Sequence, residues 1–176
     1  MLPLDQFLAA SERRAYRICL LATGEQADAL DIVQDAMLKL VKHYARRAPE
    51  EWPALFHRIV QNTIKDWYRK EKVRRRWRSW FSIHDDEGEK EDGLEQQAQQ
   101  GTHQPDELTG QSIAMAHLDD QIRQLPLRQQ QTFLLRQWEG LDVAATAKAM
   151  GISEGSVKTH YSRAVHKLRE TLEEHV

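Results

Sequence analysis

Hydrophobic residues recur with the period of an α-helix on both sides of one polar segment. Between residues 27 and 44 the apolar spacings of three, four and seven predict one buried helix face, formed by Leu30, Val33, Met37, Leu40, Val41 and Tyr44. A further helix is predicted from Pro53 to about Lys72, because proline suits a first helical turn and Leu55, Phe56, Ile59, Val60, Ile64 and Trp67 form a second stripe. No segment alternates with strand period, so the pattern predicts an all-α fold.

The C-terminal part of the chain carries signals for a helix-turn-helix. Helices are predicted over about 115–125 and 128–139, and two capped helices follow them closely. Asp142 and Ser153 are good N-cap residues, and Gly151 between them can adopt the left-handed turn that ends a helix. Helix, glycine turn and helix in this order are typical of a DNA-binding motif whose second helix enters a major groove.

The spacing alone leaves DNA-binding and purely structural interpretations equally open, and the polar face of the last helix favours DNA. One side of this helix is apolar and is expected to face inward: Val157, Tyr161, Ala164, Leu168 and Leu172. The outward positions near its start carry hydrogen-bonding side chains that can reach bases and phosphates: Ser156, Lys158, Thr159, Ser162 and Arg163.

The polar segment divides the charge of the chain unevenly. Residues 1–80 hold 16 Lys and Arg against 10 Asp and Glu, residues 81–110 hold 1 against 9, and residues 111–176 hold 8 against 8. The acidic and glutamine-rich middle segment has too few apolar residues to order itself. We therefore expect two small helical domains, 1–80 and 111–176, joined by a flexible acidic linker, 81–110.

A basic block near the end of the first domain is a candidate nucleic-acid surface. Seven of the ten residues from Arg69 to Arg78 are Lys or Arg, and aromatic residues lie beside them. Cations hold a phosphate backbone, and aromatic rings stack on unpaired bases. Because Trp67 lies on the apolar stripe, we expect Tyr68, Trp77 and Trp80 to be the rings available for stacking.

The remaining composition favours a protein without enzyme chemistry, located in the cytoplasm. The single cysteine, Cys19, lies on an apolar stripe and is predicted to be a core thiol. Residues 1–10 lack the pattern of a signal peptide, and no apolar run reaches the length of a membrane span. No Cys/His cluster, phosphate loop or nucleophile constellation is present in the sequence, so no metal or cofactor is expected.

Three segments resemble the extracytoplasmic-function (ECF) sigma factors of bacteria. Residues 27–40, ADALDIVQDAMLKL, are similar to the family's core-polymerase-binding helix, whose centre typically reads Asp-Leu-Val-Gln-Glu. The spacing of Ile59, Asn62, Asp66 and Arg69 resembles the family's promoter -10 helix. The sequence from Leu125 onward is similar to the -35-binding domain almost end to end.

The resemblance implies a sigma factor that binds RNA polymerase core and promoter DNA, opens the promoter, and is controlled by an anti-sigma factor. It assigns core binding to Asp31, Gln34 and Asp35. It assigns the -10 element to a second group of residues on and beyond the -10 helix, namely Asn62, Asp66, Arg69, Lys72, Arg74, Arg75 and Arg76. It assigns the -35 element to the last helix, through Ser156, Lys158, Thr159, His160, Ser162 and Arg163.

Some positions depart from the family pattern. Ala145, Thr146 and Ala147 replace the usual Glu-Ile-Ala, His160 occupies a commonly basic position, and Trp52 lies three residues ahead of the usual tryptophan. Two other classes stay open on the sequence: a DNA-binding regulator with an unrelated N-terminal sensor, and an adaptor that sequesters a partner. The basic aromatic helix argues against the first, and the polar recognition helix argues against the second.

Overall fold

The structure is a computed structural model, and it describes residues 3–82 and 110–173. Within these ranges the elements are α-helices and one short 3-10 helix. They are α1 (Pro3–Thr23), α2 (Gln26–Tyr44), η1 (Pro49–Glu51), α3 (Trp52–Ser82), α4 (Gly110–Arg123), α5 (Leu127–Gln137), α6 (Val143–Met150) and α7 (Glu154–Glu173). The all-α prediction is confirmed. No helix of the described part is long and apolar enough to cross a membrane.

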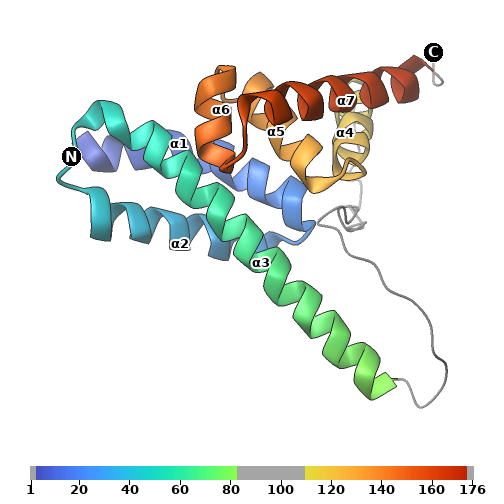
Figure 1. Cartoon of the computed structure of the whole chain (residues 1–176), viewed down its shortest axis with the longest axis horizontal. Coiled ribbons are helices and arrows are strands. Elements are labelled where there is room, and N and C mark those ends of the chain that lie inside the picture. Colours follow the sequence, from blue (N-terminus) through green and yellow to red (C-terminus); the bar gives the residue numbers. More distant parts are fainter. Residues whose placement is uncertain (1–2, 83–109, 174–176) are drawn as a thin grey trace.

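The N-terminal half is built from α1, α2 and α3, which pack against one another (Figure 1). Their core includes Ile18, Val33, Phe56, Val60 and Ile64, each at most 2% exposed. Cys19 is fully buried, as predicted, and this burial raises the pKa of its thiol well above the ordinary value. The thiol therefore contributes packing rather than reactivity.

The buried face of α2 differs from the face that the apolar pattern predicted. Leu30 and Val41 are 46% and 44% exposed, whereas the pattern assigned both to the core. Val33 and Leu40 are buried as predicted, and Met37 and Tyr44 pack against the core. The helix also buries Ala29, Ile32 and Ala36, which the pattern did not assign to the core. Fully buried Ala29 and Ala36 are seven residues apart, and their small side chains permit close approach of the neighbouring helices. The outer side of α2 consequently carries large apolar residues.

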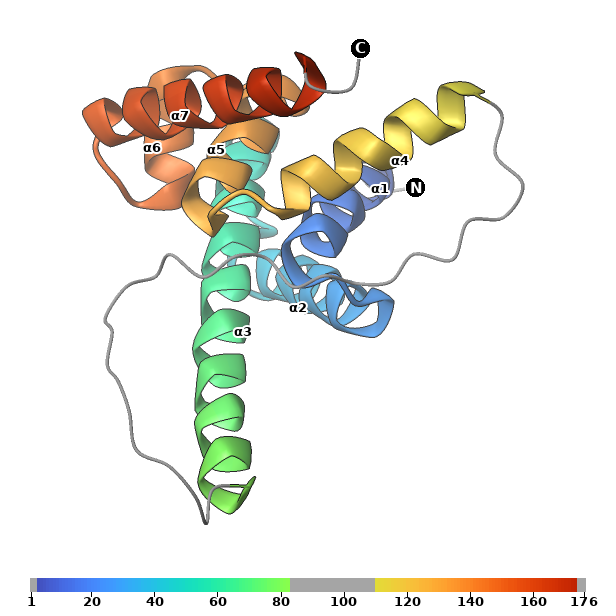
Figure 2. The same cartoon turned by 90° about the vertical axis from the view of Figure 1, so that its right-hand side faces the viewer.

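Helix α3 is longer than the sequence predicted. It starts at Trp52, whose indole Nε1 donates to the Tyr44 carbonyl oxygen at 3.1 Å, and it continues to Ser82 rather than ending near Lys72. The C-terminal part of α3 extends beyond the rest of the bundle in both views (Figures 1 and 2). The basic residues beyond Lys72, past the predicted end of this helix, thus also lie on α3.

The predicted helix-turn-helix is present, and its caps are those that the sequence indicated. The Asp142 carboxylate accepts from the Ala145 backbone N–H at 2.7 Å, and the Ser153 hydroxyl accepts from the Ser156 backbone N–H at 3.1 Å. Gly151 has a φ of 66°, a conformation that favours glycine. These local hydrogen bonds set where α6 ends and α7 begins.

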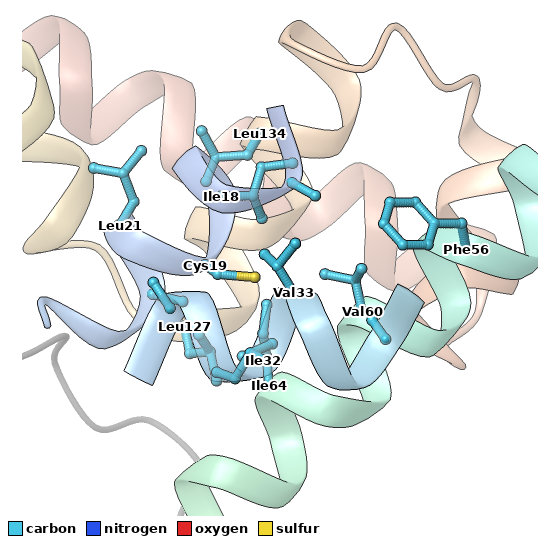
Figure 3. Packing of buried hydrophobic residues seen from close by; sticks show 14 of the residues in the cluster. Ile18, Cys19, Leu21, Ile32, Val33, Phe56, Val60, Ile64, Leu127 and Leu134 are labelled. Atoms are coloured by element: carbon cyan, nitrogen blue, oxygen red, sulfur yellow. The ribbon is translucent and has the colours of Figure 1, made fainter. Parts of the chain in front are cut away.

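The two halves share one large hydrophobic cluster, and a smaller cluster of Leu135, Ala149 and Met150 lies within the C-terminal half. Leu127 and Leu134 of α5 lie beside Ile18 and Leu21 of α1 and the buried residues of α2 and α3 (Figure 3). Sequence periodicity identified each buried stripe but could not show that they meet across the chain. The packing of α5 against α1 joins the two halves in this structure.

The α2 helix offers a matched test of this core. Leu40 is fully buried and Leu38 is 68% exposed on the same helix. We expect Leu40→Ala to lower the free energy of unfolding by about 2–5 kcal/mol, because it removes buried methyl groups and leaves a cavity. Leu38→Ala should change it by less than about 0.5 kcal/mol. Urea denaturation followed by circular dichroism measures both; equal losses would show that the face of α2 is wrongly assigned.

Candidate partner and nucleic-acid interfaces

The outer side of α2 brings the predicted partner residues together. Asp31 and Gln34 are exposed, and Asp35 is partly exposed with its carboxylate 2.7 Å from the Lys39 ammonium. Exposed apolar residues follow the same side at helical spacing: Leu30, Leu38 and Val41. The resulting α2 face combines a carboxylate, an amide and apolar surface, which is the composition of a protein interface.

Sequence reasoning missed the apolar part of the α2 face. It placed Leu30 and Val41 in the core because any apolar residue at helical spacing fits a buried stripe. The alanines of the alternative stripe, Ala29 and Ala36, were the available signal. Two equally periodic stripes can be separated only by knowing which one a neighbouring helix approaches.

One side of α3 presents the residues predicted for the -10 element. Asn62, Asp66 and Arg69 are all exposed and recur at intervals of four and three, so they lie on one side of the helix. The Arg69 guanidinium Nη1 donates to the Asp66 Oδ1 at 3.3 Å. Buried Val60 and Ile64 occupy the opposite side. This α3 face therefore offers amide, carboxylate and guanidinium groups to solvent while the helix itself is held by the core.

The basic block continues along the extended part of α3. Arg74, Arg75 and Arg76 are exposed, and Lys72 is partly exposed. The Glu71 carboxylate lies 3.6 Å from the Arg74 guanidinium and 4.0 Å from that of Arg75, so it offsets only part of this charge. A helix that carries cations on several sides and extends away from the bundle suits contact with a phosphate backbone.

Tyr68 does not have the role predicted for it. Its hydroxyl donates to the Ala22 carbonyl oxygen at 2.5 Å, and its ring packs edge-on against Trp67 with the ring centroids 5.0 Å apart. Burial raises the pKa of Tyr68 to about 12, although the positive charge of Arg75 acts in the other direction. Tyr68 therefore ties α3 to the end of α1 and is not available for stacking. The side chains of Trp77 and Trp80 lie outside the described residues.

Helix α7 exposes the side predicted to read DNA. Lys158, Thr159, Ser162 and Arg163 are exposed, while Ser156 and His160 are partly buried. The inward side is confirmed for Val157, Ala164 and Leu168, which are at most 5% exposed; the Leu172 side chain lies outside the described residues.

The Ser156 hydroxyl lies 2.9 Å from the Ser153 hydroxyl, and the Thr159 hydroxyl donates to the Gly155 carbonyl oxygen at 3.0 Å. Lys158, Ser162 and Arg163 are thus the positions with the freest reach.

A set of ionic contacts between the halves was not predicted from the sequence. The Glu139 carboxylate, with its side chain 6% exposed, lies 3.5 Å from the Arg14 guanidinium and 3.3 Å from the His57 imidazole. Arg17 pairs with Asp119 and lies over the Trp138 ring, 5.5 Å from its centroid. These residues are far apart in the chain, so no local pattern could have identified them.

Two pKa shifts mark this junction. Burial alone would raise the pKa of Glu139, but the hydrogen bond from His57 and the positive charges of His57 and Arg14 together lower it below the ordinary value. Burial also lowers the pKa of Lys65, and the nearby Arg128, Arg69 and Arg58 lower it further. In the described ranges no three His, Cys, Asp or Glu side chains come together to hold a metal ion.

Comparison with known proteins was consistent across sequence and structure. Residues 7–74 match the family model "Sigma-70 region 2", and residues 116–168 match "Sigma-70, region 4". The chain is 30% identical over 162 residues to the ECF RNA polymerase sigma factor SigL of Mycobacterium tuberculosis, which covers 90% of this chain and 82% of that protein. It is 26% identical over 174 residues to the RNA polymerase sigma-E factor of Streptomyces avermitilis, covering 98% of this chain and 87% of the relative.

The fold is similar to that of a solved sigma factor. RpoE of Bartonella quintana, solved with the anti-sigma factor NepR, aligns over 96% of each chain with a TM-score of 0.69 and 18% sequence identity. The two matched regions correspond to the N-terminal and C-terminal halves described above, and neither family model extends into residues 83–109.

The lowered pKa of Glu139 gives a pH-dependent prediction. A carboxyl group whose pKa is lower in the folded state stabilises the fold above its unfolded-state pKa, and this contribution is lost as the pH falls through the folded value. At pH 7 we expect Glu139→Gln to cost about 1.5–3 kcal/mol, because it replaces a charged hydrogen-bond partner with a neutral one. Urea titrations from pH 7 to pH 3 should show this difference shrinking below about pH 4.5. Exposed Glu12→Gln is the control; a difference independent of pH would contradict the assignment.

Proposed function

The chain belongs to the ECF family of bacterial RNA polymerase sigma factors, and on that premise we propose how its exposed faces divide the work of initiation. Residues 1–80 bind core polymerase and open the -10 element, and residues 111–176 read the -35 element. This assignment of contacts to different helices is supported by three exposed polar faces, on α2, α3 and α7. The opposite side of each of these helices is buried. A rigid helix with one free polar side is suited to recognition.

The α2 face is the proposed polymerase contact. Asp31, Gln34 and Asp35 supply the polar part, and Leu30 and Leu38 beside them supply apolar surface. Exposed apolar residues near charged ones are typical of surfaces that bind another protein. A duplex DNA partner would not favour an acidic face, because it would repel phosphates.

The α3 face and the basic block after it are the proposed -10 contacts. Arg69, Lys72, Arg74, Arg75 and Arg76 would hold the backbone. Exposed Asn62 and Asp66 offer hydrogen-bonding groups of the kind that read the edge of an unstacked base. No catalytic chemistry is required for this step, because the binding energy of the extruded strand offsets the loss of base pairing. The protein would act as an initiation factor and not as an enzyme.

The exposed side of α7 is the proposed -35 contact. Lys158 and Arg163 can reach guanine edges or phosphates, Ser162 and Thr159 can contact either, and partly buried Ser156 and His160 lie at the margin of this surface. The protein would work in the cytoplasm, where polymerase and promoters are. Since the Bartonella quintana relative was solved with an anti-sigma factor, we propose an anti-sigma partner for this chain as well.

Charge reversal on α2 tests the polymerase contact. Asp31→Lys combined with Gln34→Lys should weaken binding to core polymerase at least about tenfold, or about 1.4 kcal/mol, because it places cations in an acidic recognition face. Circular dichroism should stay native, since both side chains are exposed. Glu50→Lys, an exposed acid of the same half, is the control. Unchanged affinity in the α2 variant, measured by fluorescence anisotropy, would remove this face from the interface.

Asn62→Ala tests the opening step separately from binding. Because Asn62 is exposed, the variant should fold normally and form closed complex at near wild-type affinity. Loss of a base-reading hydrogen bond should reduce open complex about 5- to 150-fold, which corresponds to about 1–3 kcal/mol. Permanganate reactivity of promoter thymines measures open complex, and a mobility shift on duplex promoter measures closed complex. Equal loss of both would contradict a specific role in opening.

A further inference from the structure

The junction between the two halves contains a chain of buried side-chain amides. Gln61 of α3 donates from Nε2 to Gln131 Oε1 at 2.8 Å, and Gln131 of α5 donates to Gln130 Oε1 at 2.8 Å. Gln130 in turn donates to the Leu21 carbonyl oxygen of α1 at 3.0 Å. All three glutamine side chains are at most 2% exposed. Because the chain ends on a carbonyl, which can only accept, every amide in it has one possible orientation.

Each half completes a helix end of the other. The last carbonyl groups of a helix have no partner within that helix. The Leu21 carbonyl, in the last turn of α1, receives Gln130 from the C-terminal half. The Met150 carbonyl, at the end of α6, receives the Lys65 ammonium from the N-terminal half. This exchange is specific, because both donors reach an acceptor that the partner half leaves open.

The polar contacts between the halves can be broken without leaving a polar group that lacks a hydrogen-bond partner, because water can replace each partner. Amides, an ammonium group and helix-end carbonyls all form hydrogen bonds with water when they are exposed. The ionic contacts of Glu139 and Asp119 with α1 and α3 would likewise become solvated. Lys65 lies near three arginines, Arg58, Arg69 and Arg128, and this repulsion limits the strength of the closed arrangement. Opening also exposes apolar residues shared across the junction, such as Leu127 and Leu134 of α5, so the polar contacts decide the balance between the closed and open forms together with this apolar contact.

The closed arrangement cannot span a promoter. The -10 and -35 promoter elements are centred about 10 and 35 base pairs upstream of the transcription start, so about 25 base pairs separate their centres. This is roughly 85 Å along the duplex at about 3.4 Å per base pair. A compact body the size of the described residues has a radius of gyration of about 15 Å. The α3 and α7 faces, held on one such body, cannot reach both elements at once. The 27 residues between Ser82 and Gly110 can bridge at most about 95 Å when extended, so separation of the halves is within reach of the chain.

We propose that the buried amides of Gln61, Gln130 and Gln131, with the Lys65 contact to α6, form a reversible latch that closes the free protein and must release before both promoter elements are bound. The proposal rests on the sigma-factor function given above. It assigns a regulatory role to residues that touch neither DNA nor polymerase. Opening is then a step that polymerase binding can drive, since the bound state favours separated halves.

Charge introduced into the latch tests it. Gln131→Glu places a carboxylate in a fully buried site of the closed form, whereas in the open form the same residue is solvated. The variant should therefore open without unfolding either half. Gln61→Glu makes the same change from the opposite side of the contact, and Gln124→Glu, on an exposed glutamine of the C-terminal half, is the control. Native circular dichroism verifies that each variant is folded.

Distance measurement on the full chain reports the latch directly. Spin labels at Ala10→Cys and Arg169→Cys occupy exposed positions on α1 and α7, and fully buried Cys19 stays unlabelled. Free wild type and Gln124→Glu should give one short, narrow distance distribution. Gln131→Glu and Gln61→Glu should give longer and broader ones, as should wild type bound to core polymerase. A long, broad distribution in free wild type, or no change in either latch variant, would overturn the proposal.

Promoter affinity without polymerase reports the consequence of closure. If the closed form of the free protein outnumbers the open form about ten to one, only the small open fraction can bind both elements. A variant that is mostly open should then bind a duplex carrying both elements about tenfold more tightly. Open variants with wild-type affinity would overturn the regulatory role. Core-polymerase binding by wild type separates the two claims: a protein that closes but binds no polymerase keeps the latch and loses the proposed function.

Discussion

The buried end of α1 is the constraint on which the rest of the structure depends. A helix that ends inside a core leaves carbonyl groups that must find donors. The Leu20 carbonyl receives the Gly24 backbone N–H, the Leu21 carbonyl receives Gln130, and the Ala22 carbonyl receives the Tyr68 hydroxyl. One helix end thereby contacts the turn that follows it, the middle of α3 and the α5 helix of the C-terminal half. In this structure these contacts position α3 and α5 against α1.

Because the core holds α3 on one side, the residues on its other side are positioned for recognition. Its N-terminal part is buried on one side by Phe56, Val60 and Ile64, which orients Asn62 and Asp66 outward. The C-terminal part of the helix extends away from the bundle (Figure 2), and this part carries the exposed cations Arg74, Arg75 and Arg76. Recognition needs both properties, since base reading requires a rigid position and backbone contact requires reach. A helix ending near Lys72 would have provided the first and not the second.

Local features of this fold could be predicted from the sequence, and contacts between distant segments could not. The caps at Asp142 and Ser153 and the turn at Gly151 depend on neighbours within four residues, and all three are confirmed. The predicted outward side of α7 is confirmed except at Ser156, which is partly buried. The buried side of α2 was misassigned at Leu30 and Val41 because two overlapping apolar stripes fit one helix. Tyr68 was wrongly expected to be free because its acceptor lies 46 residues away. The glutamine chain had no signal, since a buried and a solvated glutamine look alike in sequence. The domain boundaries and the acidic linker stay predictions, and the linker lies outside the described residues.

Run-off transcription with purified core polymerase tests the central claim most directly. The account predicts that this chain, added to core polymerase and a pool of promoter fragments, produces transcripts from a small set of templates that share two elements about 25 base pairs apart, centre to centre. Core polymerase alone should not initiate from these templates. Specific binding of the chain to duplex DNA, with no transcript from any template in the presence of polymerase, would contradict the account and favour a regulator of another class.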